Sequence, residues 1–326
     1  MIQIKRNKVK LWSRIGARAT YGQAMLEMAK VREDFYVMSA DLCQSSGLVR
    51  FRDEFPNRFL NAGIAEQNMI GIAAGLAKDG MNVFATSFSP FITMRACEQV
   101  RMNMGYMQLN IKTVGLGSGL VMAQLGNSHF GIEDASVMRA IPGMTVIEPA
   151  DGAEIVKAVE ALCDYKKPAY LRLTGGPGLP FVYEEDFDFE IGKAIRVREG
   201  RDIAIIATGT MVYYAMKAAE ILAEQNIEAT VIDMHTIKPL DQECVDSQLD
   251  KNLIVTVEEA TIVGGLGSAV AEHLASKHKK PAQIMIGIDD CFPLAGSYEY
   301  LLKQCGLTAE LIAEKIKMAY GSERRE

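Results

Sequence analysis

The stretch that decides the fold is NAGIAEQNMIGIAAGLAKDGMNVFATSF, residues 61–88. Its first part has the length and the small, apolar side chains of a helix, and Gly71 and Gly75 predict that this helix packs closely on its neighbours. Its last seven residues, 82–88, form a short run typical of a strand. The carboxylate of Glu66 lies at the start of the helix. Because an ionised carboxylate is costly to bury alone, Glu66 requires either solvent or a partner.

The same alternation of helix and strand patterns extends along the chain. Strand-like runs occupy 35–41, 82–88, 111–117, 144–149 and 169–173, and then 203–208, 229–234, 252–258 and 283–288. Helix-length segments or turns separate them, which is typical of a mainly parallel sheet flanked by helices. Between the two series, residues 175–192 are rich in Gly, Pro and acidic residues. The sequence therefore predicts an α/β protein with one domain at 1–180, a linker at 181–192 and a second domain at 193–326.

The composition agrees with two globular domains. The 326 residues exceed the usual length of one domain, and 49% are hydrophobic and 23% charged. A net charge of −6 disfavours nucleic acid and anionic membranes as partners. The chain lacks an apolar signal segment and any run of about 18 apolar residues, so we expect a soluble, cytoplasmic protein. The six cysteines form no CxxC pair, which indicates reduced thiols and no metal site.

Two further features are candidates for function. His129 lies in GLVMAQLGNSHFGIED, residues 119–134, a weakly charged loop after a strand, where α/β proteins place ligands. Phe88 and Phe91 precede an amphipathic helix, either as core aromatics or as a platform for a flat heteroaromatic ring. We expect VGGLGSAV (263–270) to be a plain strand-to-helix turn, and Glu258 and Glu259 to be a solvated pair at a strand end.

A resemblance to a known family is carried by several collinear segments. These are SADLCQSS (39–46), NAGIAEQNMIGIAAGLA (61–77), LGNSHFGIEDASVMRAIPGMTVIEPAD (125–151) and VTVEEATIVGGLGSAVAE (255–272). Their order resembles the transketolase superfamily, which includes 1-deoxyxylulose-5-phosphate synthases, over about residues 15 to 320. Only the pyrimidine-binding and C-terminal domains are matched, because KDG at 78–80 is the nearest string to the family's diphosphate-binding GDG motif. The chain thus resembles the C-terminal subunit of a split transketolase.

This resemblance implies a thiamine-diphosphate enzyme that transfers a two-carbon ketol unit from a ketose to an aldose. The cofactor would be shared with a separately encoded diphosphate-binding subunit, which would hold most of the Mg²⁺ ligands, and a heterotetramer is expected. Glu66 matches the glutamate that hydrogen-bonds N1′ of the aminopyrimidine and favours its imino tautomer, which deprotonates thiazolium C2. Phe88 and Phe91 match positions that stack on the pyrimidine, and Ile92 can be aligned there as well.

The resemblance also implies residues on the substrate side. His129 matches a histidine that polarises a sugar oxygen, and Asp41 and Ser45 match positions near the thiazolium and the sugar phosphate. Arg18 matches a phosphate-binding arginine. Further candidates for substrate binding are Arg95 and Arg172.

Some positions depart from the transketolase pattern. Leu125 stands where a hydroxyl-binding Asp is usual, Gly117 where a phosphate-binding His is usual, and Gly175 where an Arg is usual. Without these polar and charged side chains, the site would make fewer charge-assisted hydrogen bonds to a sugar. We therefore expect a ketose that has a different distal group or needs fewer hydroxyls for binding. The alternatives to a transketolase are the β subunit of a 2-oxo-acid dehydrogenase, a 1-deoxyxylulose-5-phosphate synthase-like enzyme and a non-catalytic scaffold subunit.

Overall fold

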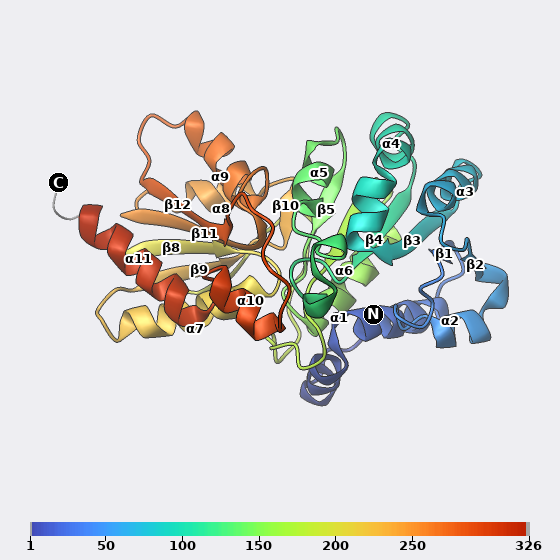
Figure 1. Ribbon diagram of the computed structural model, residues 1–326, viewed down its shortest axis with the longest axis horizontal. Helices are drawn as coiled ribbons and strands as arrows, with labels where there is room; N and C mark the ends of the chain where they lie inside the picture. Colours follow the sequence, from blue (N-terminus) through green and yellow to red (C-terminus); the bar gives the residue numbers. More distant parts are fainter. Residues whose placement is uncertain (1, 324–326) are drawn as a thin grey trace.

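The computed structural model describes residues 2–323, which form two α/β domains lying side by side (Figure 1). The first contains a seven-stranded sheet of order β10-β5-β6-β4-β3-β1-β2, and the second a five-stranded sheet of order β12-β11-β8-β9-β7. All neighbouring strands are parallel except β10 against β5 and β7 against β9. The predicted class, two domains with mainly parallel sheets flanked by helices, is confirmed.

The elements have the following bounds. The strands are β1 (Phe35–Ser39), β2 (Phe59–Asn61), β3 (Asn82–Phe88), β4 (Ile111–Leu116), β5 (Thr145–Ile147), β6 (Ala169–Leu173), β7 (Ile195–Arg198), β8 (Ile203–Ala207), β9 (Ala229–Asp233), β10 (Thr236–Lys238), β11 (Leu253–Thr261) and β12 (Ala282–Ile288). The α-helices are α1 (Arg6–Ala29), α2 (Val49–Glu54), α3 (Glu66–Lys78), α4 (Cys97–Val100), α5 (Asp134–Ala140), α6 (Gly152–Asp164), α7 (Met211–Ala223), α8 (Gln242–Asp246), α9 (Leu266–Ala275), α10 (Tyr298–Gln304) and α11 (Ala309–Glu323). Four short helical turns complete the set: η1 (Pro56–Arg58), η2 (Phe91–Arg95), η3 (Arg101–Tyr106) and η4 (Ala123–Ser128).

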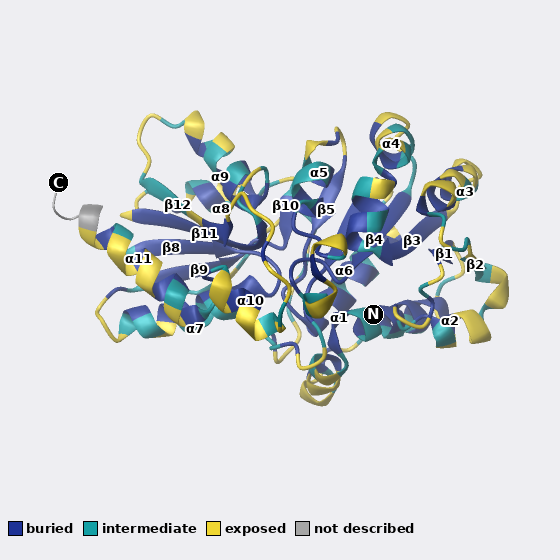
Figure 2. Ribbon diagram, viewed as in Figure 1, coloured by how far each residue is buried: buried dark blue, intermediate teal, exposed yellow. Residues whose placement is uncertain are grey.

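The central strands are buried on both faces, as a parallel sheet requires. Every residue of β4, β6, β8 and β9 is buried, and Figure 2 shows exposed residues mainly on the outer faces of the helices and on the connecting loops. Helix α6 is fixed at its start by a reciprocal cap. Asp151 accepts a hydrogen bond from the backbone N–H of Glu154 (2.9 Å), and the Glu154 carboxylate accepts one from Ala150 (2.6 Å).

The described helices include none long and apolar enough to cross a bilayer. All six cysteines lie in the described part of the chain and are free thiols, as predicted.

Strand β10 joins the two halves of the molecule. It follows β9 in sequence, yet it pairs antiparallel with β5, and Thr236 lies opposite Ile147. A segment from the second half of the chain therefore forms the edge of the first sheet.

Buried charges also join the halves. Arg172 on β6 is completely buried, and its Nε donates to Asp134 (3.0 Å) while Nη1 pairs with Glu148. Its Nη2 donates to the carbonyls of Gly131 (2.7 Å) and Glu259 (3.0 Å), and Glu259 belongs to β11 of the second domain. Burial opposes the charge of Arg172, but the carboxylates outweigh burial and raise its pKa. Arg172 is thus an internal cross-link between β6, α5 and β11.

The expectation that Glu258 and Glu259 are solvated is wrong, because both side chains are buried. Glu258 accepts hydrogen bonds from the backbone N–H groups of Leu266 and Gly267 (2.8 Å each) at the start of α9. The predicted glycine-rich turn is therefore present, and its backbone needs this carboxylate. The carboxylate of Glu259 accepts hydrogen bonds from the other elements around it: the backbone of Leu120 and the hydroxyls of Thr210 and Tyr298, each at 2.7 Å.

These buried carboxyls predict that the chain loses stability as the solution becomes alkaline. Burial raises the pKa of Glu148 from 4.5 to about 8 and that of Glu258 to about 7. A raised pKa in the folded state gives stability that is complete below pH 4.5 and is lost as the pH rises through 7 and 8. We expect the free energy of unfolding in urea to fall by about 2 to 4 kcal/mol between pH 6 and 8.5. The fall should be smaller in Glu148→Gln, and a flat wild-type profile would contradict the prediction.

Candidate active site

The predicted site residues converge at one edge of the first sheet. Asp41 follows β1, Phe88 ends β3, and His129 follows η4 in the long segment after β4. The backbone N–H of Ala40 donates to the carbonyl of Thr86 (3.2 Å), which holds the ends of β1 and β3 together. Since β1, β3 and β4 are parallel, these residues share the carboxyl edge of the sheet, where α/β proteins bind ligands.

Glu66, the first residue of α3, has a buried carboxylate that is 2% exposed. One oxygen, Oε1, accepts a hydrogen bond from the hydroxyl of Ser87 on β3 (2.9 Å). The other, Oε2, accepts one from Nη1 of Arg95 at the end of η2 (2.9 Å). The partner that the sequence required for Glu66 is therefore present within the chain. Because Ser87 and Arg95 both donate to it, the buried carboxylate is stable, and the two hydrogen bonds fix its orientation.

Three rings lie against one another beside this carboxylate. The ring of Phe91 makes edge contacts with Phe88 (centroids 6.0 Å apart) and His129 (5.3 Å), and Phe88 also contacts His129 (5.8 Å). The guanidinium carbon of Arg95 lies 3.9 Å from the centroid of Phe91. The hydroxyl of Ser128 is within hydrogen-bond distance of His129 Nδ1 (3.0 Å). Glu66, Phe88, Phe91 and His129, which are far apart in sequence, are thus brought together.

The segment that presents Phe91 and Arg95 is irregular. η2 is a π-helical turn, η3 is another, and only the four residues of α4 between them are α-helical. The hydroxyl of Thr93 donates to the carbonyl of Ser89 (2.7 Å) and supports this turn. Wide turns of this kind are rare and occur frequently at functional sites. Here the turn places Phe91 and Arg95, its first and last residues, on the same side.

Asp41, Ser45 and Arg18 lie on neighbouring segments. Asp41 is exposed and has a positive φ of 59°, and its carboxylate accepts a hydrogen bond from the amide of Asn61 (3.1 Å). Ser45 is exposed in the following loop, which reaches α1 at Gly47: a Cβ there would lie 2.9 Å from Cα of Ala19. Arg18 is half-buried, and burial lowers its pKa.

The side chain of Arg18, which lies within α1, makes no hydrogen bond or ion pair with residues 2–323. Its charge is therefore free for an anion, as a phosphate-binding role would need.

The structure corrects three expectations. Arg172 is fully buried, and its donors are taken up by carboxylates and carbonyls, so the prediction that it binds substrate is wrong. Ile92 is completely buried in the core with Met69 and Ile70, so it offers no face to a ring. Gly71 and Gly75 are exposed with open space at their Cβ positions, so the close packing predicted for α3 is absent at the two glycines within residues 2–323. It is present on the opposite side of the helix, where Ala73, Ala74 and Ala77 are buried.

One contact was missed by sequence reasoning. Ser87, which holds Glu66, is a small polar residue inside a buried strand, and such a residue usually has a hydrogen-bond partner. Alternation along β3 does not mark it, because every residue of this strand from 82 to 87 is buried.

The carboxylate and the rings fit one half of a thiamine-type cofactor. Glu66 can accept a hydrogen bond from a ring N–H, and the faces of Phe88 and Phe91 can stack on a flat ring. Among residues 2–323 no group of three His, Cys, Asp or Glu side chains could hold a metal ion. The part of the chain that the structure describes therefore fits the aminopyrimidine of the cofactor and offers no such acidic cluster for a metal–diphosphate group.

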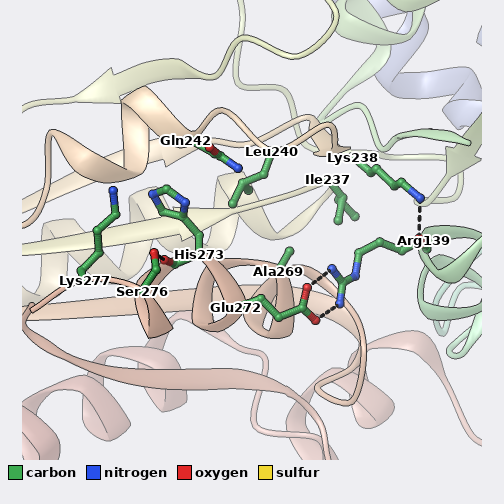
Figure 3. Close-up of a pocket in the computed structure, with 10 residues that line it drawn as sticks. All are labelled: Arg139, Ile237, Lys238, Leu240, Gln242, Ala269, Glu272, His273, Ser276 and Lys277. Atoms are coloured by element: carbon green, nitrogen blue, oxygen red, sulfur yellow. Dashed lines mark hydrogen bonds and ion pairs between the residues drawn. The ribbon is translucent and has the colours of Figure 1, made fainter. Parts of the chain in front are cut away.

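A separate crevice of about 650 Å³ lies at the domain junction (Figure 3). Arg139 of α5 pairs with Glu272 of α9 (2.9 Å) and donates to the carbonyl of Gly264 (2.6 Å). Lys238 of β10 donates to the carbonyls of Arg139 (2.8 Å) and Ile141 (2.6 Å). Arg139 and Lys238 therefore already have protein partners, and the contacts of Arg139 join α5 of the first domain to α9 of the second. None of the predicted site residues lines it.

Comparison with known proteins agrees with this architecture. The chain matches the family described as "Transketolase, pyrimidine binding domain" over residues 13–176 and that described as "Transketolase, C-terminal domain" over residues 192–312. It is 42% identical to a 6-deoxy-6-sulfo-D-fructose transketolase subunit of Clostridium sp. (strain MSTE9), covering 90% of this chain and 91% of the relative. It is 38% identical to one of the subunits of the apulose-4-phosphate transketolase of Phocaeicola vulgatus, covering 92% of this chain and 96% of the relative.

A solved structure is similar over nearly the whole length. It is described as a split gene transketolase, inactive beta4 tetramer, and it superimposes with a TM-score of 0.85 at 37% identity, covering 94% of this chain and 98% of the other. The chain has both domains in the same order as these relatives, and it therefore belongs to the transketolase family.

Proposed function

We propose that this chain is the pyrimidine-domain subunit of a split transketolase. It transfers a two-carbon ketol unit from a ketose to an aldose with thiamine diphosphate, which it shares with a separately encoded diphosphate-binding subunit. The observation that carries the proposal is the buried Glu66 carboxylate, held by Ser87 and Arg95 beside the rings of Phe88, Phe91 and His129. A scaffold subunit would have no need of a buried carboxylate at a ring-lined edge.

Each residue has a defined task in this proposal. When bound, thiamine diphosphate supplies a nucleophilic thiazolium carbon. Glu66 holds a proton at N1′ of the aminopyrimidine, and Ser87 keeps the carboxylate in the orientation this requires. Phe88 and Phe91 bind the pyrimidine ring by stacking. His129 donates a hydrogen bond to a substrate oxygen and helps to exclude water from the reacting carbon.

Two observations support the requirement for a partner. The described residues hold no acidic cluster for a metal–diphosphate group. The similar solved structure is described as an inactive tetramer of one subunit type from a split-gene enzyme. We propose a heterotetramer of this chain and the diphosphate-binding subunit, in which each cofactor lies between two chains.

The residue that lies before His129 on the substrate side of the site favours a ketose that is not a conventional phosphosugar. Leu125 is 54% exposed in η4, just before His129, so an apolar side chain lies where a carboxylate would bind a hydroxyl. Two relatives are named for transketolases of 6-deoxy-6-sulfo-D-fructose and of apulose-4-phosphate, which agrees with variation in the substrate.

Calorimetry tests the proposed function. We expect thiamine diphosphate with Mg²⁺ to give a binding isotherm when this chain is mixed with the diphosphate-domain subunit encoded by a neighbouring gene, and none with this chain alone. A mixture with an unrelated protein of similar charge is the control. Tight binding by the chain alone would overturn the split arrangement, and the absence of binding in the mixture would favour the scaffold alternative.

A further inference from the structure

Arg95 occupies the place that the proposed cofactor ring needs. Its guanidinium donates to Oε2 of Glu66 (2.9 Å) and lies over the face of Phe91, with 3.9 Å between the guanidinium carbon and the ring centroid. An aminopyrimidine bound by Glu66 and stacked on Phe91 would make the same two contacts: a hydrogen bond to the carboxylate and a flat π contact. The two groups cannot occupy one face of Phe91 together.

We propose that Arg95 is a displaceable plug in the cofactor site, which fills the seat of the aminopyrimidine in the free chain and swings out when the cofactor binds. This inference rests on the proposed function and adds a step to it. The plug also explains how a carboxylate that is 2% exposed is tolerated before the cofactor arrives. Arg95 supplies the second donor, and the cofactor later replaces it.

The remaining contacts of Arg95 allow this movement. Its side chain is 45% exposed, and its described partners are Glu66 and Phe91 alone. The backbone of Arg95 is anchored separately, because its carbonyl accepts a hydrogen bond from the side-chain amide of Gln67 (3.1 Å). The side chain can therefore rotate toward solvent while η2 keeps its place. The guanidinium can enter water because it is already 45% exposed, and the hydrogen bond that Glu66 gives up is replaced by the one from the cofactor.

Of the three groups that contact the Phe91 ring, the guanidinium of Arg95 lies nearest to its centroid. Phe88 and His129 are inclined to Phe91 at 77° and 67°, with ring centroids 6.0 and 5.3 Å away, whereas the guanidinium carbon of Arg95 lies over the Phe91 ring at 3.9 Å from its centroid. An aminopyrimidine stacked on the face that Arg95 covers would therefore require Arg95 to move.

The test measures thiamine diphosphate binding by the complex of this chain with its diphosphate-domain subunit. Removing the plug with Arg95→Ala should raise the association rate of thiamine diphosphate with Mg²⁺, followed by stopped flow, and lower its Kd in calorimetry by about fivefold to thirtyfold. Arg95→Gln should give a smaller change in the same direction. Arg101→Ala is the matched control, because Arg101 pairs with Glu98 (2.8 Å) in the same segment and has no contact with Glu66; its Kd should equal that of the wild type.

Thermal unfolding gives a second readout. Arg95→Ala should lower the melting temperature of the free chain, since Glu66 loses a partner, and the deficit should shrink in the cofactor-loaded complex. If Arg95→Ala does not fold, the Kd of Arg95→Gln decides the question.

Weaker or unchanged binding by the Arg95 variants, with normal binding by the wild type, would overturn the plug and leave the proposed function intact. Absence of binding by the wild-type complex would instead overturn the proposed function and the plug together.

Discussion

Glu66→Gln is expected to slow hydrogen–deuterium exchange at thiazolium C2 by about 100- to 10,000-fold in the reconstituted complex. The glutamine side chain has nearly the same size, so it keeps the hydrogen bond with Ser87, but it cannot hold a proton at N1′. The affinity for the diphosphate group should persist, because Glu66 lies on the aminopyrimidine side. Proton NMR of quenched samples measures the exchange, and calorimetry measures the binding.

The control for this variant is Glu98→Gln, because Glu98 is an exposed glutamate of the neighbouring α4 that pairs with Arg101. Its exchange rate should match that of the wild type. Exchange at the wild-type rate in Glu66→Gln would remove Glu66 from the proposed chemistry.

Arg172→Met should cause the largest loss of stability, about 3 to 5 kcal/mol, because it leaves the buried carboxylate of Asp134 without its cation and the buried carboxyl of Glu148 without its donor. Asp134 and Glu148 both pair with Arg172, and the carbonyls of Gly131 and Glu259 would lose their donor as well. The loss is measured as the change in free energy of unfolding in urea at pH 7. Since the cross-link joins both domains, we expect a single transition shifted to lower urea.

Arg196→Met provides the comparison for Arg172→Met. Arg196 pairs with Glu199 on the surface, with side chains 41% and 75% exposed, and such pairs contribute about 0 to 1 kcal/mol. Equal losses in the two variants would show that the buried network carries no special stabilisation.

The main strands could be predicted because the residue types and the spacing that mark a strand are found within a few consecutive residues. All nine predicted strands are present, and β3 and β6 have the predicted bounds. The strands that were missed, β2, β7 and β10, have only three or four residues each. Segments of this length carry too few side chains to show a period, and their pairing is decided by tertiary contacts.

The site was predicted only in part, for a related reason. Spacing and residue type singled out Glu66 and His129, and the fold brings them to the same cluster of rings. The same reasoning failed at Arg172, because a sequence does not reveal that Asp134 and Glu148 converge on it from α5 and the end of β5. It failed at Glu258 for a similar reason, since the backbone donors of α9 that stabilise the buried carboxylate come from a later segment.

The pairing of β10 with β5 has a consequence for synthesis on the ribosome. Until residues 236–238 emerge, β5 is an open edge whose unpaired N–H and C=O groups can recruit other strands. The first domain therefore cannot complete its sheet when its own sequence has been made, but must wait for some sixty further residues, roughly the span from β6 to β10. Shortened chains that end between the domains would keep this edge exposed, and we expect them to associate through it more readily than the full chain does.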